Sequence, residues 1–407
     1  MALPKDEETG FSAEGGESVL ARASALVPDL EIRATACEEA RQVPRATVEA
    51  YQAARLVGLY APTRFGGHGA PMETGLGVIE ALSRGCGSSA WVLAVYQIHA
   101  WLVSLMAPEA QEDVFGGPEG ANTVIAGSLQ PRGTLAAVTE RGQEGFRLEG
   151  GPWPFASGGD YGRWAVVGAM IQDEGAEPAP AMCLLAPDSW TLEDDWFVSG
   201  LKGTGSKSIV AAPRFVPTRH VTRFSELLAG TAPGQTAGAD AVQRAAFVPM
   251  LTLNVTAPAL GTAVAALADF MARADGRFLA FSGEMQGDAG EAHIQIAEAS
   301  AKADAARLVL RESAGRVRQY SEQGVDMPLL ARAQVRRDAA WAVRACVEAV
   351  DLLSLASGGG ALHREHPMQR WQRDVHAMAA HAILPYETNM KLYGRAAMGK
   401  SLSTPFV

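Results

Sequence analysis

The 407-residue sequence contains few cysteines, and they are far apart. They stand at positions 37, 86, 183 and 346, and no two of them form a Cys-x-x-Cys pair. A structural zinc site or a disulfide framework needs closely spaced or paired cysteines, so neither is expected, and we predict no metal site. The four cysteines are predicted to be small buried apolar residues.

Positive charge and long apolar runs are also scarce. The net charge is −10, whereas a nucleic-acid partner would require a basic face. No run approaches the roughly 18 apolar residues of a transmembrane helix, and the first residues lack the basic and then apolar order of a secretory signal. We therefore expect a cytoplasmic protein with no membrane or nucleic-acid partner.

Nucleotide-binding fingerprints are missing as well. No Gly-x-Gly-x-x-Gly run opens a βαβ unit. The run from Gly203 to Ser208 is rich in glycine and hydroxyls, but Ser206 separates Gly205 from Lys207. The Gly-Lys-Ser/Thr order of a phosphate loop is therefore not met, and the chain has no evident site for a nicotinamide cofactor.

What is present falls into three zones of different texture. The first, residues 1–121, is predicted to be helical, with helices at 16–40, from Pro44 onward, at 72–83 and at 88–106. Ser88 and Ser89 are predicted N-caps of the last of these helices. The second zone, residues 122–235, has short β-rich runs divided by Gly and Pro, at 123–128, 146–149, 164–167, 182–185 and 208–210. These runs predict a small antiparallel barrel or sandwich.

The third zone, residues 236–407, is rich in alanine. Its long segments at 241–281, 291–322, 327–356 and 367–399 predict an antiparallel four-helix bundle. The fold class is thus α+β and mainly α.

Two local patterns carry chemistry. Phe155, Ser157 and Gly158 together offer an aromatic face, a hydroxyl and close backbone approach, which a flavin ring requires. An ordinary turn would favour the same Ser and Gly. Asp374 and His381 are seven residues apart on one predicted helix and would share a face, so His381 could exchange a proton with a bound group. Either it or His99 could instead be a hydrogen-bonded core histidine.

The order of zones, together with four segments, resembles the acyl-CoA dehydrogenase superfamily. Within it, the segments are similar to two-component flavin monooxygenases of the p-hydroxyphenylacetate hydroxylase type, often called group D. The segments are Ser88–Trp91 with His99–Trp101, Gly127–Pro131 with Phe155–Gly158, Trp196–Ser206 with Phe215–Pro217, and Ser357–Gly360 with Trp371–His376 and His381. The resemblance covers nearly the whole chain.

The resemblance implies roles for particular residues. His381, His99 and Ser157 are implied to be catalytic, and His99 and Ser128 to contact the substrate. The implied cofactor contacts are Phe155, Ala156, Ser157, Trp196, Thr204, Ser206 and Arg277. Arg370 and Arg373 are alternatives to Arg277 for the flavin phosphate.

The implied activity is that of an oxygenase component. Reduced FMN or FADH₂ would diffuse from a separate NAD(P)H:flavin reductase and react with O₂ to a C4a-hydroperoxyflavin. This intermediate would hydroxylate an aromatic or other electron-rich small molecule. A homotetramer is also implied. The choice between FMN and FAD and the identity of the substrate stay open.

Two other functions remain as alternatives. An acyl-CoA dehydrogenase resembles this chain but places a glutamate base eight residues after the Arg-Asp pair, where this chain has Ala382. Glu284, Glu291 and Glu298 remain candidates for a base on another helix. The second alternative is a non-catalytic helical scaffold, which flavin binding would exclude.

Overall fold

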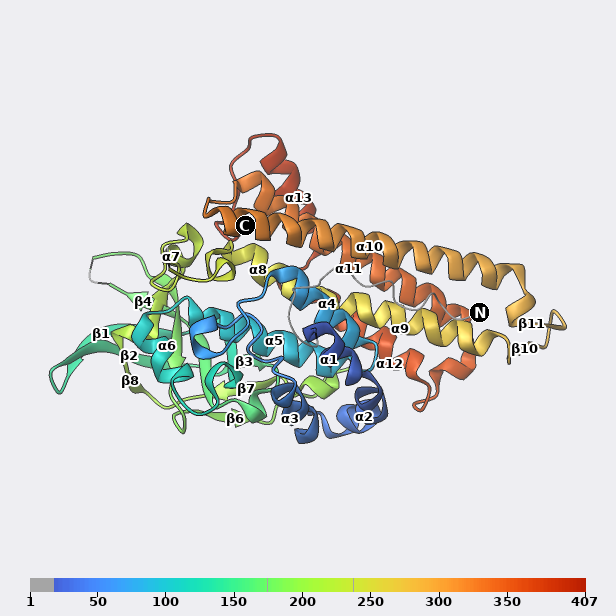
Figure 1. The fold of residues 1–407 in the computed structure, drawn as a ribbon, viewed down its shortest axis with the longest axis horizontal. Coiled ribbons are helices and arrows are strands. Elements are labelled where there is room, and N and C mark those ends of the chain that lie inside the picture. The colour runs from blue at the N-terminus through green and yellow to red at the C-terminus, as the bar shows by residue number, and fades with distance from the viewer. Residues whose placement is uncertain (1–17, 174, 237) are drawn as a thin grey trace.

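The structure, a computed structural model, describes residues 18–173, 175–236 and 238–407. The start of the helix predicted at 16–40 lies outside these residues. Figure 1 shows an elongated molecule in which long helices run side by side along one part and the sheets lie toward the other end. The predicted class, mainly helical with a curled sheet in the middle, is confirmed.

Helices form the part of the chain before the sheets. They are α1 (Val19–Ala25), α2 (Val27–Ala40), α3 (Arg45–Ala53), α4 (Met72–Ser83), α5 (Gly87–Ser104) and α6 (Pro108–Phe115). The predicted bounds of α4 are confirmed. The single helix predicted up to residue 40 is wrong, because the chain breaks at Leu26, just before Pro28, which can be accommodated only in the first turn of a new helix.

The predicted caps of α5 are also wrong. The N-cap residue is Cys86, which makes no side-chain cap hydrogen bond, and Ser88 and Ser89 are buried within the first turn. Almost every residue of α5 is buried, so this helix runs through the core and not along its surface.

The strands form a six-stranded sheet and a three-stranded sheet. They are β1 (Ile125–Glu140), β2 (Gln143–Gly150), β3 (Trp153–Ala156), β4 (Trp164–Gln172), β5 (Ala179–Leu185), β6 (Thr191–Glu193), β7 (Lys207–Val210), β8 (Arg214–Pro217) and β9 (Val221–Arg223). The orders are β8-β2-β1-β4-β5-β9 and β3-β7-β6. The side chains of Leu135, Trp153 and Val167 belong to the core that the two sheets share.

Four of the strand runs read from the sequence fall within β2, β4, β5 and β7, and the fifth, 123–128, overlaps the start of β1. The purely antiparallel prediction, however, is wrong. Strands β1 and β4 pair in parallel. The reason is that the chain leaves the larger sheet after β2 to form β3 of the smaller one. It then re-enters beside β1 in the same direction.

The rest of the chain is again helical. Its elements are α7 (Phe224–Ala229), α8 (Phe247–Asn254), α9 (Ala257–Ala274), the hairpin β10 (Phe278–Leu279) with β11 (Glu284–Met285), α10 (Gly290–Gln323), α11 (Leu329–Ala356), α12 (Pro367–Ala379) and α13 (Tyr386–Ala397). Helices α9 to α12 pack together as the bundle (Figure 1). The predictions for α10 and α11 are confirmed to within a few residues.

The other two long helices were predicted wrongly. The segment 241–281 holds α8, α9 and the start of the hairpin, and the segment 367–399 is divided between α12 and α13. Pro258 and Pro385 stand where a new helix begins, because a proline interrupts the hydrogen bonding of a continuous helix.

One segment is more apolar than the sequence analysis anticipated. By length and composition alone, Phe247–Ala274 could cross a membrane, but 89% of its most apolar window is buried inside the structure. Helix α9 packs against α4 and α11 there, so the core accounts for its apolar character. The four cysteines are buried, as predicted, and each is a free thiol.

Candidate active site

Two aromatic side chains stand at the corner that follows β3. The ring of Phe155 lies edge-on to the ring of Trp196, with centroids 6.0 Å apart. Phe155 has a left-handed backbone (φ 68°), and the residue is 58% exposed. A large apolar ring held exposed on a strained backbone is a feature of ligand sites. These two rings therefore suit the aromatic platform that a flavin needs.

Hydroxyl groups line the same corner. Ser157 Oγ lies 2.7 Å from Ser206 Oγ, which lies 2.6 Å from Thr204 Oγ1. Thr204 Oγ1 donates to the carbonyl of Leu201 at 2.8 Å. The three hydroxyl residues predicted to contact the cofactor are thus brought together. Ala156, predicted with them, has its side chain buried between the sheets, which leaves only its backbone for a ligand.

Helix α5 holds this corner from behind. Trp91 Nε1 donates to Ser157 Oγ at 3.2 Å, and Tyr96 Oη donates to the Gly158 carbonyl at 2.8 Å. Gly158 has φ 65°, and an added Cβ would lie 2.5 Å from Tyr96 Oη, so only glycine fits there. No sequence pattern indicates this contact of Trp91, although the segment Ser88–Trp91 is one of those that carry the family resemblance.

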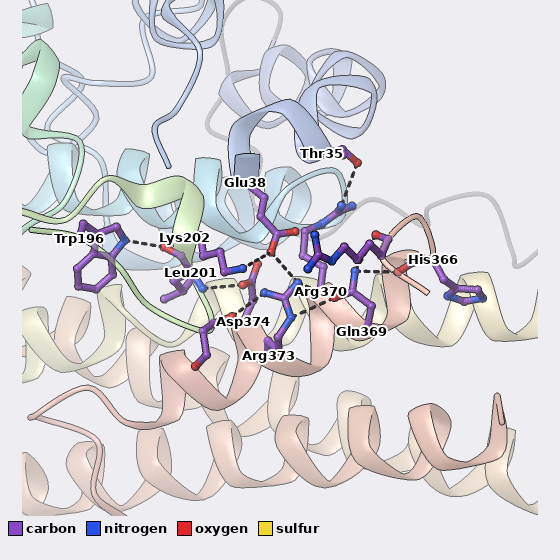
Figure 2. Close-up of polar contacts among 12 residues, drawn as sticks. Thr35, Glu38, Trp196, Leu201, Lys202, His366, Gln369, Arg370, Arg373 and Asp374 are labelled. Carbon is purple, nitrogen blue, oxygen red and sulfur yellow. Dashed lines mark hydrogen bonds and ion pairs between the residues drawn. The ribbon is translucent and has the colours of Figure 1, made fainter. Parts of the chain in front are cut away.

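The loop that carries Thr204 and Ser206 is fixed to α12 (Figure 2). The backbone N–H of Leu201 donates to Asp374 Oδ1 at 2.6 Å, and Trp196 Nε1 donates to the Leu201 carbonyl at 3.2 Å. Burial raises the pKa of the Asp374 carboxyl to about 7, against the opposing effect of the Leu201 N–H. Arg373 lies beside it and forms an ion pair of 2.6 Å with Glu38 of α2.

His381 lies next to this corner, but not on a helix as predicted. Helix α12 ends at Ala379, so His381 belongs to the connection that precedes α13. Its ring makes an edge-to-face contact with Trp91, with centroids 5.6 Å apart. Burial lowers its pKa to about 4, so the ring is neutral near pH 7. Because its Nδ1 accepts from the Ile383 N–H (3.4 Å), the ring proton is on Nε2, which is therefore a donor.

A buried arginine of α11 fixes the connection that carries His381. Arg336 donates from Nε to Asn389 Oδ1 at 2.7 Å and from Nη2 to the Ile383 carbonyl at 3.3 Å, and Nη1 donates to the Phe406 carbonyl. Asn389 Nδ2 donates to the same Ile383 carbonyl at 3.0 Å. The position of His381 thus depends on α11, α13 and the end of the chain together.

His99 has the opposite proton arrangement. Its Nδ1 lies 2.8 Å from the Ile125 carbonyl, which can only accept, so Nδ1 carries the proton and Nε2 is an acceptor. Burial lowers its pKa to about 4. The ring lies against Gly127 of β1, next to the buried Ser128. His99 is eight residues beyond Trp91 on α5, about 12 Å along the helix axis.

Arg277, the predicted phosphate contact, is not at this corner. It donates to the Ala356 carbonyl at 2.6 Å and to Gln286 Oε1 at 3.1 Å. It lies near the β10/β11 hairpin, at the end of the bundle away from the sheets (Figure 1). Of the alternatives, Arg373 is paired with Glu38, and Arg370 donates to Thr35 Oγ1 at 3.2 Å.

The carboxylates kept for a dehydrogenase base are also distant from the corner. Glu284 begins β11, and Glu291 and Glu298 lie in the first turns of α10. Strand β11 and the start of α10 are at the hairpin end of the molecule (Figure 1). Within one chain, none of the three faces the hydroxyl groups or the histidines.

Comparison with known proteins agrees with this geometry. Residues 23–115 match the N-terminal domain family of the acyl-CoA dehydrogenases, and residues 253–386 match their C-terminal domain family. These matches define a protein of the acyl-CoA dehydrogenase fold, the class that the helices and sheets describe.

Individual relatives show which branch of this superfamily the chain resembles. The chain is 31% identical to the flavin-dependent monooxygenase oxygenase subunit HsaA of Rhodococcus jostii, covering 95% of this chain and 100% of that protein. It is 30% identical to the oxygenase component of an FADH₂-dependent resorcinol hydroxylase of Rhizobium sp., over 89% of each chain. The structure of XiaF from Streptomyces sp., solved with FADH₂ and glycerol, superimposes with a TM-score of 0.87 at 25% identity, covering 95% of this chain and 96% of that one.

The chain belongs to the oxygenase components of two-component flavin-dependent monooxygenases, within the acyl-CoA dehydrogenase superfamily. The prediction made from the four segments is thereby confirmed. The exposed Phe155 ring, the half-buried Trp196 ring and the adjoining hydroxyls fit the reduced flavin on which such enzymes depend.

Proposed function

We propose that this chain hydroxylates an aromatic substrate that carries a hydroxyl group, with reduced flavin bound at the Phe155–Gly158 corner. The observation that carries the proposal is the position of Trp91. Its indole N–H reaches Ser157 of the predicted cofactor corner, and its ring contacts His381, the predicted catalytic histidine. One side chain thus joins two groups that the sequence places more than 200 residues apart.

The bound reduced flavin supplies two electrons, and one atom of O₂ enters the substrate while the other leaves as water. The chain positions the reactants. Phe155 and Trp196 support the ring, and the neutral His381 offers its Nε2–H to oxygen. His99 Nε2 accepts a hydrogen bond from a substrate hydroxyl, because the ring proton is on Nδ1 and is donated to the Ile125 carbonyl. A phenol presents the matching donor, and one relative is named a resorcinol hydroxylase.

The partners follow from the same site. We propose that a separate NAD(P)H:flavin reductase supplies the reduced flavin, since the sequence has no nicotinamide fingerprint.

We further propose a homotetramer. Large apolar side chains are exposed on the hairpin and the long helices, namely Phe281, Ile294, Leu308 and Leu355. Arg277 could reach a flavin phosphate only from another copy. We also propose a cytoplasmic location, in keeping with unpaired, buried cysteines.

Replacement of His381 by alanine tests the proposed role. We expect product formed per flavin oxidised to fall by about tenfold or more, with H₂O₂ released in its place, because proton handling by a positioned histidine is lost. Flavin binding and oxidation should continue. The assay supplies chemically reduced flavin and a panel of phenols, and measures product and H₂O₂ together.

His376→Ala is the matched control. His376 lies on α12 and pairs with Asp351 on the exposed side of the helix. It should couple oxidation to hydroxylation as well as the unmodified protein does. Equal coupling in the His381→Ala and His376→Ala variants would refute the role of His381.

A further inference from the structure

The hydroxyl groups at the flavin corner form a chain with only one possible direction. The 2.8 Å contact between Thr204 Oγ1 and the Leu201 carbonyl requires a proton, and a carbonyl has none to give. The single proton of Thr204 is therefore directed at Leu201. Ser206 must then donate to Thr204, across 2.6 Å, and Ser157 must donate to Ser206, across 2.7 Å.

The hydrogen bonds at the Ser157 end of this hydroxyl chain run in the same direction. The indole N–H of Trp91 can only donate, so Ser157 Oγ is its acceptor. Ser157 thus gives its one proton to Ser206 and receives one from Trp91. What it has left for a ligand is a lone pair and not a proton. Ser157, Ser206 and Thr204 are all buried, so water does not offer them other partners.

The direction of the chain is secured at Leu201. The Leu201 N–H is held by Asp374 at 2.6 Å, and its backbone has φ 52°, which places the carbonyl toward Thr204. The same carbonyl accepts from Trp196 Nε1 at 3.2 Å. Donors gather on this oxygen, so it is a fixed acceptor at which the chain of hydroxyl protons ends.

This direction matters for a flavin because N5 changes its hydrogen-bonding character with redox state. N5 of a reduced flavin carries a hydrogen and donates, whereas N5 of an oxidised flavin only accepts. In the flavin placement proposed here, N5 faces Ser157 Oγ. An acceptor-only Ser157 then accepts from the N5–H of a reduced flavin, whereas it meets only the N5 lone pair of an oxidised flavin, which leaves both groups unsatisfied.

We propose that Thr204 and Ser206 are positioning residues that keep Ser157 an acceptor and so make the site selective for reduced over oxidised flavin. The inference rests on the flavin placement proposed above. It assigns redox-state selectivity to a hydrogen-bond direction that is set at Leu201, on the far side of Ser157 from Trp91.

The test measures dissociation constants of oxidised flavin and, without oxygen, of reduced flavin. Thr204→Val removes the hydroxyl at the end of the hydrogen-bond chain. Ser206 can then donate to Ser157, which leaves the Ser157 proton free to be donated to a ligand. In Ser206→Ala the acceptor for the Ser157 proton is removed. We expect each variant to bind oxidised flavin about tenfold more tightly than the unmodified protein, because a hydrogen bond replaces an unsatisfied contact. Affinity for reduced flavin should change less.

Two controls separate direction from packing. Thr204→Ser keeps the hydroxyl and should keep the original selectivity. Thr252→Val is matched to Thr204→Val, because Thr252 is also buried and also donates to a backbone carbonyl at 2.8 Å, that of Val248 in α8. It should leave both dissociation constants unchanged.

The outcomes are distinct. If Thr204→Val and Ser206→Ala weaken both redox forms equally, or leave their ratio unchanged, the hydroxyls only pack the site and the inference is wrong. If the unmodified protein binds reduced flavin no better than a protein with Phe155→Ala, the flavin does not occupy this corner, and the proposed placement fails instead.

Discussion

The buried His99 should make the stability of the protein depend on pH in a defined window. In the folded chain, the pKa of His99 is about 4, against an ordinary value of 6.5, because burial of the ring disfavours its charged form. Between these two pH values His99 is protonated in the unfolded chain but neutral in the folded chain. The free energy of unfolding must therefore decrease as the pH falls from 6.5 to 4 and must be unaffected by this group above 6.5.

The size of the effect follows from the two pKa values. Each pH unit between them removes about 1.4 kcal/mol, so His99 withdraws about 3 kcal/mol of stability by pH 4. This is a large share of the free energy of unfolding of a typical domain, which is roughly 5–15 kcal/mol. The Nδ1 donor bond to Ile125 remains throughout, since that nitrogen carries its proton in both forms.

His99→Gln isolates the contribution. Glutamine can still donate to the Ile125 carbonyl, but it takes up no proton in this range. We expect the variant to lose about 3 kcal/mol less than the unmodified protein between pH 7.5 and pH 4, by urea unfolding at each pH. His381, whose pKa is also about 4, contributes equally to both proteins and cancels. Parallel pH profiles for the two proteins would show that His99 is not held neutral by burial.

Two further substitutions probe the supports of the histidines. Gly127→Ala should lower the melting temperature and raise KM for a phenol. The new Cβ would lie 2.6 Å from the Val166 carbonyl and 2.9 Å from His99 Cε1. The control Gly290→Ala should change neither quantity, because nothing lies within 4 Å of a Cβ at that position. Arg336→Met should cost about 2–3 kcal/mol in urea unfolding by leaving buried acceptors unpaired. It should also increase H₂O₂ release, since the His381 connection is no longer held, and normal coupling in a folded variant would show that Arg336 does not position it.

Local patterns predicted much of the fold. The helical and β-rich zones, the bounds of α4, and α10 and α11 could be derived from composition and periodicity. The errors concentrate where prolines follow helical sequence. Pro258 and Pro385 begin new helices within segments whose alanine content favours continuation. The parallel pairing of β1 with β4 could not be derived either, because it depends on where β3 departs to the second sheet.

The candidate site divides in the same way. Small hydroxyls beside glycines mark a close approach of backbone to ligand, so Ser157, Thr204 and Ser206 could be selected from the sequence. The residues that give these groups their direction could not. Trp91 and Asp374 act through a single N–H and a single carboxyl oxygen, across 66 and 173 residues. No spacing rule relates positions so distant in the chain.

The helix predicted around His381 is wrong, yet the residue lies beside the candidate flavin corner. The seven-residue spacing from Asp374 assumed a continuous helix, but the helix ends at Ala379, and His381 reaches Trp91 from a connection held by Arg336. Its proton is on Nε2 because the Ile383 N–H occupies Nδ1, whereas His99 keeps its proton on Nδ1 because the Ile125 carbonyl accepts it. Two neutral histidines with almost the same pKa are therefore a donor and an acceptor. That difference, on which the proposed chemistry depends, comes from two backbone groups and not from the histidines themselves.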